Sequence, residues 1–299
     1  MIAAFVIFLR EGVEASMIVA ILLAYLNRTG QRRHFRDVFA GVGAALALAL
    51  GGGLAAYFTI HNYAGSRVQT IFETITFLLA AAVLTYMTFW MRAHAPRMSG
   101  ELRGRVDAAL DRKTRTGLSL LAFQAVGREG LETVVFTLAL AFSATGRNVL
   151  VGGAAGLVVA LAVAVFIYRL GHKLNLGRFF AVVGALLMVF AAGLLSDAVQ
   201  NMQQLGWFPF LTHALWNTGH VLSEDSALGD LLHSFFGYAE HPTVGQPVVY
   251  TAYLAVVLFA YFRLSRRARR SAPAARAHPA AAARPAPAAG GERARVSSV

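Results

Sequence analysis

Residues 2–26 read IAAFVIFLREGVEASMIVAILLAYL, an apolar stretch with three charged residues near its middle. A membrane-spanning helix needs about 20 consecutive, mostly apolar residues, and comparable stretches recur at 36–60, 70–91, 117–143, 148–170, 178–200 and 246–263. The first stretch has no positive leader and is broken by charges, so it is expected to stay in the mature protein and not to be cleaved as a signal peptide. The sequence predicts an all-α, polytopic membrane protein with seven transmembrane helices.

The composition points to lipid as the solvent of this chain. Hydrophobic residues make up 57% of the 299 residues and charged residues 14%, whereas a soluble domain carries roughly 25% charged residues. Cysteine is absent, which excludes disulfides, thiolate metal sites and cysteine nucleophiles. Any metal chemistry must therefore use oxygen or nitrogen ligands.

Basic residues concentrate in every second loop and in the C-terminal segment, and all but four of the 27 follow this pattern. Cytoplasmic loops carry the excess of lysine and arginine, so we expect the N-terminus outside, the C-terminus inside, and a location in the cytoplasmic (inner) membrane. Topology thereby accounts for the net charge of +12, and no nucleic-acid partner is expected.

Three segments lie outside the predicted spans. Residues 92–116 form a cytoplasmic loop whose pattern favours a short helix along the membrane surface. Residues 201–245 form an acidic outer loop without lysine or arginine. Residues 264–299 form a basic cytoplasmic tail, and its part from 272 onward, rich in alanine, proline and arginine, is predicted to be disordered.

The chain contains an internal repeat. Arg10-Glu11-Gly12-Val13-Glu14 aligns with Arg128-Glu129-Gly130-Leu131-Glu132, and a glycine-rich span follows each motif. The alignment divides the chain into three-helix repeats, 1–91 and 117–200, with 246–263 as an extra helix. Because each repeat has an odd number of spans, the second is expected to be inverted, which places a transporter's substrate site near the midplane between the repeats. The glycines would allow close helix packing there.

Each motif places its three ionisable groups on one helix face. A turn of about 100° per residue brings Arg10, Glu11 and Glu14 onto one side of the helix. A charged side chain at the centre of a bilayer costs ~2.5–3.5 kcal/mol, so these groups must line an interior cavity or pair with each other. Pairing within each helix would only fasten the bundle. The less favourable order of Arg10 and Glu14 as an i,i+4 pair suggests instead that the arginines brace glutamates across the repeat interface.

The motifs carry a surplus of negative charge. Glu11, Glu14, Glu129 and Glu132 outnumber Arg10 and Arg128, leaving two negative charges when all six are ionised, and Glu73 in the third predicted helix is a further carboxylate. Such a site needs a cation, and carboxylate oxygens without thiolates favour hard ions such as magnesium, calcium, manganese or oxidised iron. Methionines such as Met87 are interpreted as packing residues.

The two Arg-Glu-x-x-Glu motifs resemble those of the oxidase-dependent iron permease family, which includes fungal high-affinity iron permeases and bacterial EfeU-type transporters. The resemblance extends over residues 1–263. Further matching segments are Phe72-Glu73-Thr74, Thr85-Tyr86-Met87, Phe89-Trp90-Met91, Leu215-Trp216, Leu222-Ser223 and Gly237-Tyr238. Asn217 departs from the acidic residue expected after the tryptophan.

The resemblance implies a permease that imports iron, ferrous or ferric, with Glu11, Glu14, Glu129 and Glu132 handling the ion during permeation. Iron is then the substrate and no permanently bound cofactor is expected. The family also implies an extracytoplasmic partner that oxidises or delivers iron.

Other functions remain weaker alternatives. A cation/proton antiporter uses mid-membrane carboxylates equally well. A di-iron enzyme would combine glutamates with a Glu-x-x-His pattern, and no predicted span contains a histidine, so no enzyme is expected. Outer-segment histidines could receive a metal ion but are more consistent with solvated or structural positions: His61, His213, His220, His233 and His241.

Overall fold

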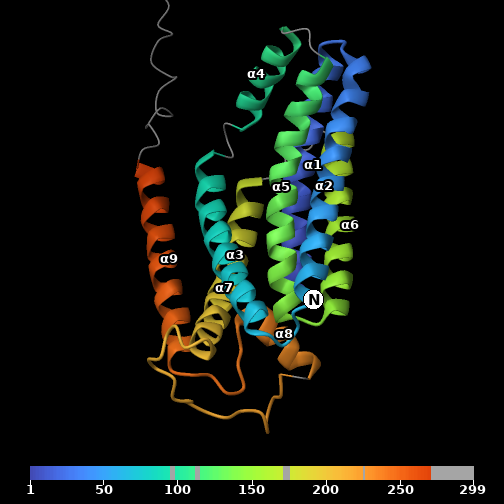
Figure 1. Cartoon of the computed structure of the whole chain (residues 1–299). Helices are drawn as coiled ribbons and strands as arrows, with labels where there is room; N and C mark the ends of the chain where they lie inside the picture. Colours follow the sequence, from blue (N-terminus) through green and yellow to red (C-terminus); the bar gives the residue numbers. More distant parts are fainter. Residues whose placement is uncertain (95–97, 112–114, 171–175, 225, 271–299) are drawn as a thin grey trace, which may run out of the picture. The chain divides into compact units, whose positions relative to one another are not determined.

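A computed structural model shows a mostly helical chain (Figure 1). The structure describes residues 1–94, 98–111, 115–170, 176–224 and 226–270. Over these residues the α-helices are α1 (Ile2–Arg28), α2 (Phe35–His61), α3 (Arg67–His94), α4 (Met98–Asp111), α5 (Arg115–Ser143), α6 (Gly146–Leu170), α7 (Leu176–Gln204), α8 (Ala227–Phe236) and α9 (Gly245–Arg270). The predicted all-α class is confirmed.

Within the residues that the structure describes, four helical stretches are long and apolar enough to cross a membrane, and a shorter apolar helix covers Gly245–Tyr261. The four are Arg32–His61, Arg67–Met91, Gly146–Phe166 and Phe179–Gln204. Helices α1 and α5 have 27 and 29 residues, but each carries a charged motif, so composition alone does not mark them as spans. These helices establish a multi-pass membrane protein, while the total of seven spans remains a prediction.

The observed helices begin and end within about one turn of the predicted spans, except for α9. That helix passes the predicted end at 263 and continues to Arg270. It starts in one compact unit, Met1–Leu258, and its last residues belong to a second, Phe259–Val299. The beginning of the predicted tail is thus helical, and the predicted disordered segment 272–299 lies outside the described residues.

Glycine allows close contacts between the charged helices and their neighbours: α6 packs along α1, and α2 packs along α5 (Figure 1). A Cβ atom on Gly152 of α6 would lie 2.2 Å from the carbonyl oxygen of Met1. A Cβ atom on Gly41 of α2 would lie 2.1 Å from the carbonyl oxygen of Ser119. Both positions therefore require glycine, and the predicted role of the glycine-rich spans in close packing holds at these contacts.

Helices α3 and α7 pack against one another and against the two charged helices. Their common core contains Leu84 of α3 and Leu187 and Phe190 of α7, with Ile7 of α1 and Phe136 of α5. Lipid is as apolar as these side chains, so close packing holds such helices together, rather than exclusion of water. The core brings α1 and α5 side by side and so positions the two charged motifs.

The predicted outer loop contains a helix, α8, which its sequence pattern did not reveal. Ser226 caps its start by accepting a hydrogen bond from the Gly229 amide at 2.9 Å, and Gly237 ends it in the left-handed conformation with φ 66°. Asp230 of α8 accepts a hydrogen bond from the Asn148 side chain at 2.6 Å. This contact ties α8 to the beginning of α6, beside the N-terminus of the chain, and we call this the α8 end of the bundle.

The expected short helix between the third and fourth predicted spans is α4. Its apolar residues Leu102 and Val106 pack against α1 and α5, and the hydroxyl of Tyr25 on α1 donates a hydrogen bond to Asp107. Helix α4 thus covers the opposite end of the bundle, which we call the α4 end. Its predicted position along the membrane surface stays a prediction.

Candidate functional site

The charged face of α1 is buried within the bundle. The side chains of Arg10, Glu11 and Glu14 are each only 3% exposed. The Nε atom of Arg10 donates a hydrogen bond to Glu14 Oε1 at 2.9 Å, and its terminal nitrogen lies 3.2 Å from Glu11 Oε1. One guanidinium thus lies between two carboxylates of its own helix, as the helical repeat allows.

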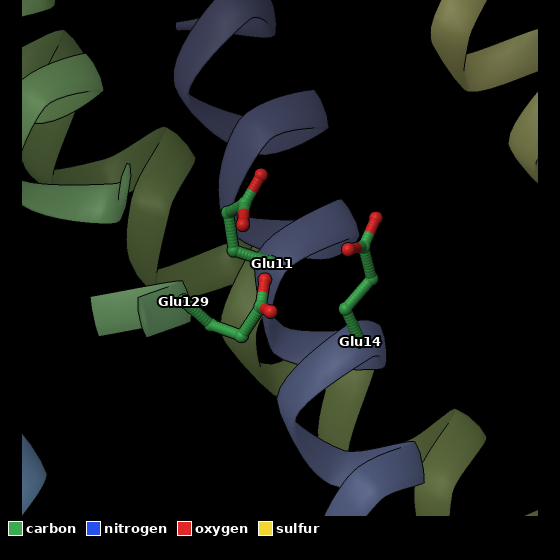
Figure 2. Close-up of side chains that lie close together, drawn as sticks. All are labelled: Glu11, Glu14 and Glu129. Carbon is green, nitrogen blue, oxygen red and sulfur yellow. The ribbon is translucent and has the colours of Figure 1, made fainter. Parts of the chain in front are cut away.

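Glu129 of α5 joins Glu11 and Glu14 in a group of three buried carboxylates. One oxygen from each residue lies within 4.8 Å of the others. Figure 2 shows Glu129 extending from α5 toward the two side chains on α1. Within the part of the chain that the structure describes, this is the one group of three or more acidic or histidine side chains close enough to share a metal ion. We call it the glutamate cluster.

Several oxygens of the glutamate cluster lack hydrogen-bond partners. Oε2 of Glu11 and Oε2 of Glu129 are buried, and no described residue forms a hydrogen bond with them, while Oε1 of Glu11 has the ion pair with Arg10 but no hydrogen bond. Burying charged groups without partners is costly, and like charges at this separation repel each other. A cation bound between the carboxylates relieves both effects, and an all-oxygen donor set suits a hard ion.

The formal charge of the cluster matches a divalent ion. With all groups ionised, three carboxylates against the single charge of Arg10 leave two negative charges. The buried setting makes this balance important, because charges interact much more strongly there than in water. A divalent cation neutralises the cluster, and a trivalent one exceeds it by one unit.

The second motif lies in a different environment. On α5, Arg128 Nε donates a hydrogen bond to Glu132 Oε1 at 3.1 Å, with side-chain exposures of 41% and 12%. The Arg128 guanidinium carbon lies 4.6 Å from the centre of the Trp90 ring, and a terminal nitrogen contacts the Met87 sulfur at 2.8 Å. Glu132 is thus held by Arg128 and is not one of the three residues of the glutamate cluster.

The prediction that the arginines brace glutamates across the repeat interface is wrong. Arg10 and Arg128 each form their ion pairs with glutamates of their own helix. The unfavourable order of an i,i+4 pair changes its energy by only a few tenths of a kcal/mol, whereas an unpaired buried charge costs ~3–5 kcal/mol. Each arginine therefore pairs with the nearest carboxylate, which lies on its own helix. The glutamate cluster nevertheless contains residues of both helices, so the motifs do more than form ion pairs within one helix.

Trp90 and Met87 were not predicted as partners of Arg128. Met87 was interpreted as a packing residue, and although it is buried, it also contacts the arginine. The segments around both residues stood out only through the family resemblance. No sequence spacing could have linked α3 to Arg128, because the contact depends on how the two helices pack.

The remaining candidates lie elsewhere. Glu73 sits in the second turn of α3, where its Oε1 accepts a hydrogen bond from Gln69 at 2.7 Å, and it does not belong to the glutamate cluster. Among the histidines, the Nδ1 of His233 lies 2.7 Å from the Tyr238 carbonyl oxygen, and His241 lies 3.6 Å from Glu240. These contacts suit structural or solvated histidines.

Fold and site together define a class: a multi-pass helical membrane protein with buried carboxylates along its helices, an arrangement typical of ion-transport pathways. The model of the iron permease FTR1 family matches residues 1–269. The chain belongs to this family, as the sequence resemblance predicted.

Similar proteins support the assignment. The chain is 36% identical over 276 residues to a protein named ferrous iron permease EfeU of Yersinia pestis, covering 92% of this chain and 98% of the relative. It is likewise 36% identical over 274 residues to the ferrous iron permease EfeU of Escherichia coli O157:H7, covering 91% and 99%. No solved structure matches the chain. The predicted iron-transport role, membrane location and absence of enzymatic function are confirmed by family membership.

Proposed function

We propose that this protein imports ferrous iron across the cytoplasmic membrane through the glutamate cluster. The observation that carries the proposal is the meeting of three buried carboxylates from two helices, within 4.8 Å of one another. Glu11, Glu14 and Glu129 supply the ligand oxygens, and Arg10 offsets part of their charge. Iron is the substrate that passes through the cluster.

The charge balance favours the ferrous ion. The cluster carries two surplus negative charges when ionised, which one divalent ion neutralises. Two relatives that span nearly the whole chain bear the name ferrous iron permease. Glu132, now paired with Arg128, is the fourth carboxylate and offers an oxygen to the ion as it enters or leaves the cluster.

The proposed topology has seven spans in two inverted repeats, 1–91 and 117–200, plus α9. Equivalent contacts recur in both repeats: Cβ atoms built on Gly12 and Gly130 would lie 2.7 Å and 3.0 Å from the Cβ atoms of Ala160 and Ala49, respectively. Helix α1 meets α6 in the first case, and α5 meets α2 in the second. This exchange of partners is what an internal two-fold axis produces, and it supports a site between inverted repeats.

The basic loops orient this arrangement. The connections at the α4 end carry the arginines, so the positive-inside rule places that end in the cytoplasm. The α8 end, with its acidic residues, then faces outward. An extracytoplasmic partner that oxidises or delivers iron would therefore act at the α8 end.

Uptake of radioactive iron tests the proposal. Cells or sealed vesicles with the parent chain should accumulate ferrous iron, and Glu11→Gln, Glu14→Gln and Glu129→Gln variants at matched protein level should not. Asp107→Asn removes the charge of an exposed acid on α4 but keeps an oxygen that can accept the Tyr25 hydrogen bond, so it is the matched control and should transport normally. Competition with manganese, zinc and magnesium measures selectivity.

The same experiment separates the permease from a cation/proton antiporter. An antiporter would move protons in exchange for a cation other than iron, and iron accumulation would not depend on the chain. Iron uptake equal in the parent and all three variants would mean that the glutamates are structural and that the proposed mechanism is wrong.

A further inference from the structure

We propose that Arg128, held by Trp90 and Met87, is the gate between the glutamate cluster and the α4 end of the bundle. The inference rests on the proposed function because it takes the cluster as the ion site. It assigns a positioning role to two residues of α3, Trp90 and Met87, that supply no ligand to the ion.

The first observation is the unequal exposure of the two motif arginines. Arg10 is 3% exposed and Arg128 is 41% exposed. Gln124, one turn before Arg128 on α5, is exposed as well. Ionisable groups at membrane depth face a bundle interior or a water-filled cavity, since hydrocarbon does not solvate them. The exposed Arg128 and Gln124, which lie between the exposed Leu120 and Leu131 on this face of α5, therefore mark the polar point at which water enters the bundle.

The direction of this entry follows from the course of α5. The helix begins at Arg115, at the α4 end, and runs toward the α8 end, so Gln124 lies on the α4 side of Arg128. Glu129 follows Arg128 directly and belongs to the glutamate cluster. Arg128 thus links the two: it belongs to the water-accessible face and directly precedes a residue of the glutamate cluster.

The second observation is the way in which Arg128 is held. Its Nε binds Glu132, while its other contacts are the Trp90 ring at 4.6 Å and the Met87 sulfur at 2.8 Å. His94, the last residue of α3, stacks on Trp90 with ring centres 4.7 Å apart. An aromatic face attracts a guanidinium, so α3 provides a fixed seat for this charge.

The charge of Arg128 makes it a barrier for cations. Arg10 lies against two carboxylates, but Arg128 contacts one carboxylate and two uncharged groups. The side of the Arg128 guanidinium that rests on Trp90 and Met87 faces no carboxylate, so a cation that passes this side meets a positive charge at short range in a medium of low dielectric. The uncharged Trp90 ring and Met87 sulfur hold the Arg128 guanidinium less tightly than a second carboxylate would. The Arg128 side chain can therefore move aside when an ion leaves the cluster.

Cysteine labelling tests the route, and the chain is suited to it because it contains no native cysteine. Gln124→Cys should react with a membrane-impermeant thiol reagent in sealed vesicles only from the face that carries the α4 end. Val158→Cys, midway along α6 and 66% exposed, is the lipid-facing control and should react from neither face. A Gln124→Cys variant that reacts from neither face, or only from the α8 face, would overturn the route.

The charge of the reagent tests the gate. In the Gln124→Cys background, Arg128→Gln should raise the rate for a cationic reagent relative to an anionic one by about fivefold or more, as loss of a nearby unit charge predicts. Trp90→Leu should shift the ratio in the same direction, because Arg128 loses its seat. Trp90→Phe keeps an aromatic face and should stay close to the parent ratio.

An unchanged ratio in Arg128→Gln would show that this charge does not guard the route and would overturn the gate. A ratio that changes equally in Trp90→Leu and Trp90→Phe would remove Trp90 as the seat. Labelling does not require iron transport, so these outcomes are independent of the uptake experiment. Failure of the parent to take up iron would contradict the proposed function and leave the water route and its gate measurable.

Discussion

The two Arg-Glu-x-x-Glu motifs are nearly identical in sequence but occupy different surroundings. On α1, Arg10 is enclosed and lies against both Glu11 and Glu14. On α5, Arg128 is partly exposed, pairs with Glu132 alone, and rests on Trp90 of α3. The first motif contributes two carboxylates to the glutamate cluster, and the second contributes one.

Neighbouring helices, and not the motif itself, therefore decide what each charge does. In an inverted-repeat carrier the two halves exchange environments as access alternates between the two sides of the membrane. Under the proposed inverted-repeat topology, the asymmetry between Arg10 and Arg128 is what one state of such a cycle would present. In the opposite state, Arg10 would be the exposed arginine and Arg128 the enclosed one.

The largest expected effect separates the three carboxylates of the glutamate cluster from Glu132. Glu11→Gln, Glu14→Gln and Glu129→Gln each delete a charged ligand of the cluster, and iron uptake should fall on the order of 100-fold or more, because loss of a residue that only supports a metal ligand already costs about 10–100-fold. Glu132→Gln should reduce uptake by only about tenfold or less, because Glu132 lies outside the cluster. Initial uptake rates at matched protein level provide the measurement, and equal losses for Glu132 and Glu11 would erase the distinction.

Stability should distinguish the two arginines. Arg10→Met leaves two buried carboxylates without their counter-charge and should destabilise the protein by ~3–5 kcal/mol. Arg128→Met removes a partly exposed ion pair and should cost ~1 kcal/mol or less. Thermal unfolding of the purified protein in detergent measures both, and similar melting temperatures for the two variants would contradict the difference in burial.

A smaller effect is expected at the glycine contacts that support the motifs. Gly152→Ala places a methyl group 2.2 Å from the Met1 carbonyl oxygen, so α6 must move from α1, at a cost of ~1–3 kcal/mol. Gly51→Ala on α2 meets no atom within 4 Å and should be neutral or stabilise its helix by up to about 1 kcal/mol. If Gly152→Ala and Gly51→Ala change the melting temperature equally, the contact between α1 and α6 is looser than described.

The last prediction concerns the orientation of the chain in the membrane. The cysteine substitutions that report this orientation should leave transport unchanged, so they are the smallest perturbation. Cysteines at the exposed residues Tyr63 and Val221 should react with an impermeant reagent from outside intact cells. A cysteine at Gly100 on α4 should react only after the cells are opened. The reverse pattern would invert the topology and with it the assignment of the α4 end to the cytoplasm.

Much of this protein follows from the sequence alone. Apolar length predicts helices at membrane depth, because only a structure that satisfies its own backbone hydrogen bonds is stable in lipid. The duplicated motif predicts the carboxylate chemistry, because six charges on two apolar helices must face inward. The family follows from the same residues, since the motifs and their neighbours are specific to it.

Tertiary structure alone decided which carboxylates meet. Glu11, Glu14 and Glu129 gather, while Glu132 pairs with Arg128 and Glu73 bonds to Gln69. Helical periodicity places side chains on a face of one helix, but it carries no information about the depth and rotation at which another helix packs against that face. Those quantities depend on the glycine contacts and on the packing of α3 and α7, and a shift of one turn there would exchange the roles of Glu129 and Glu132.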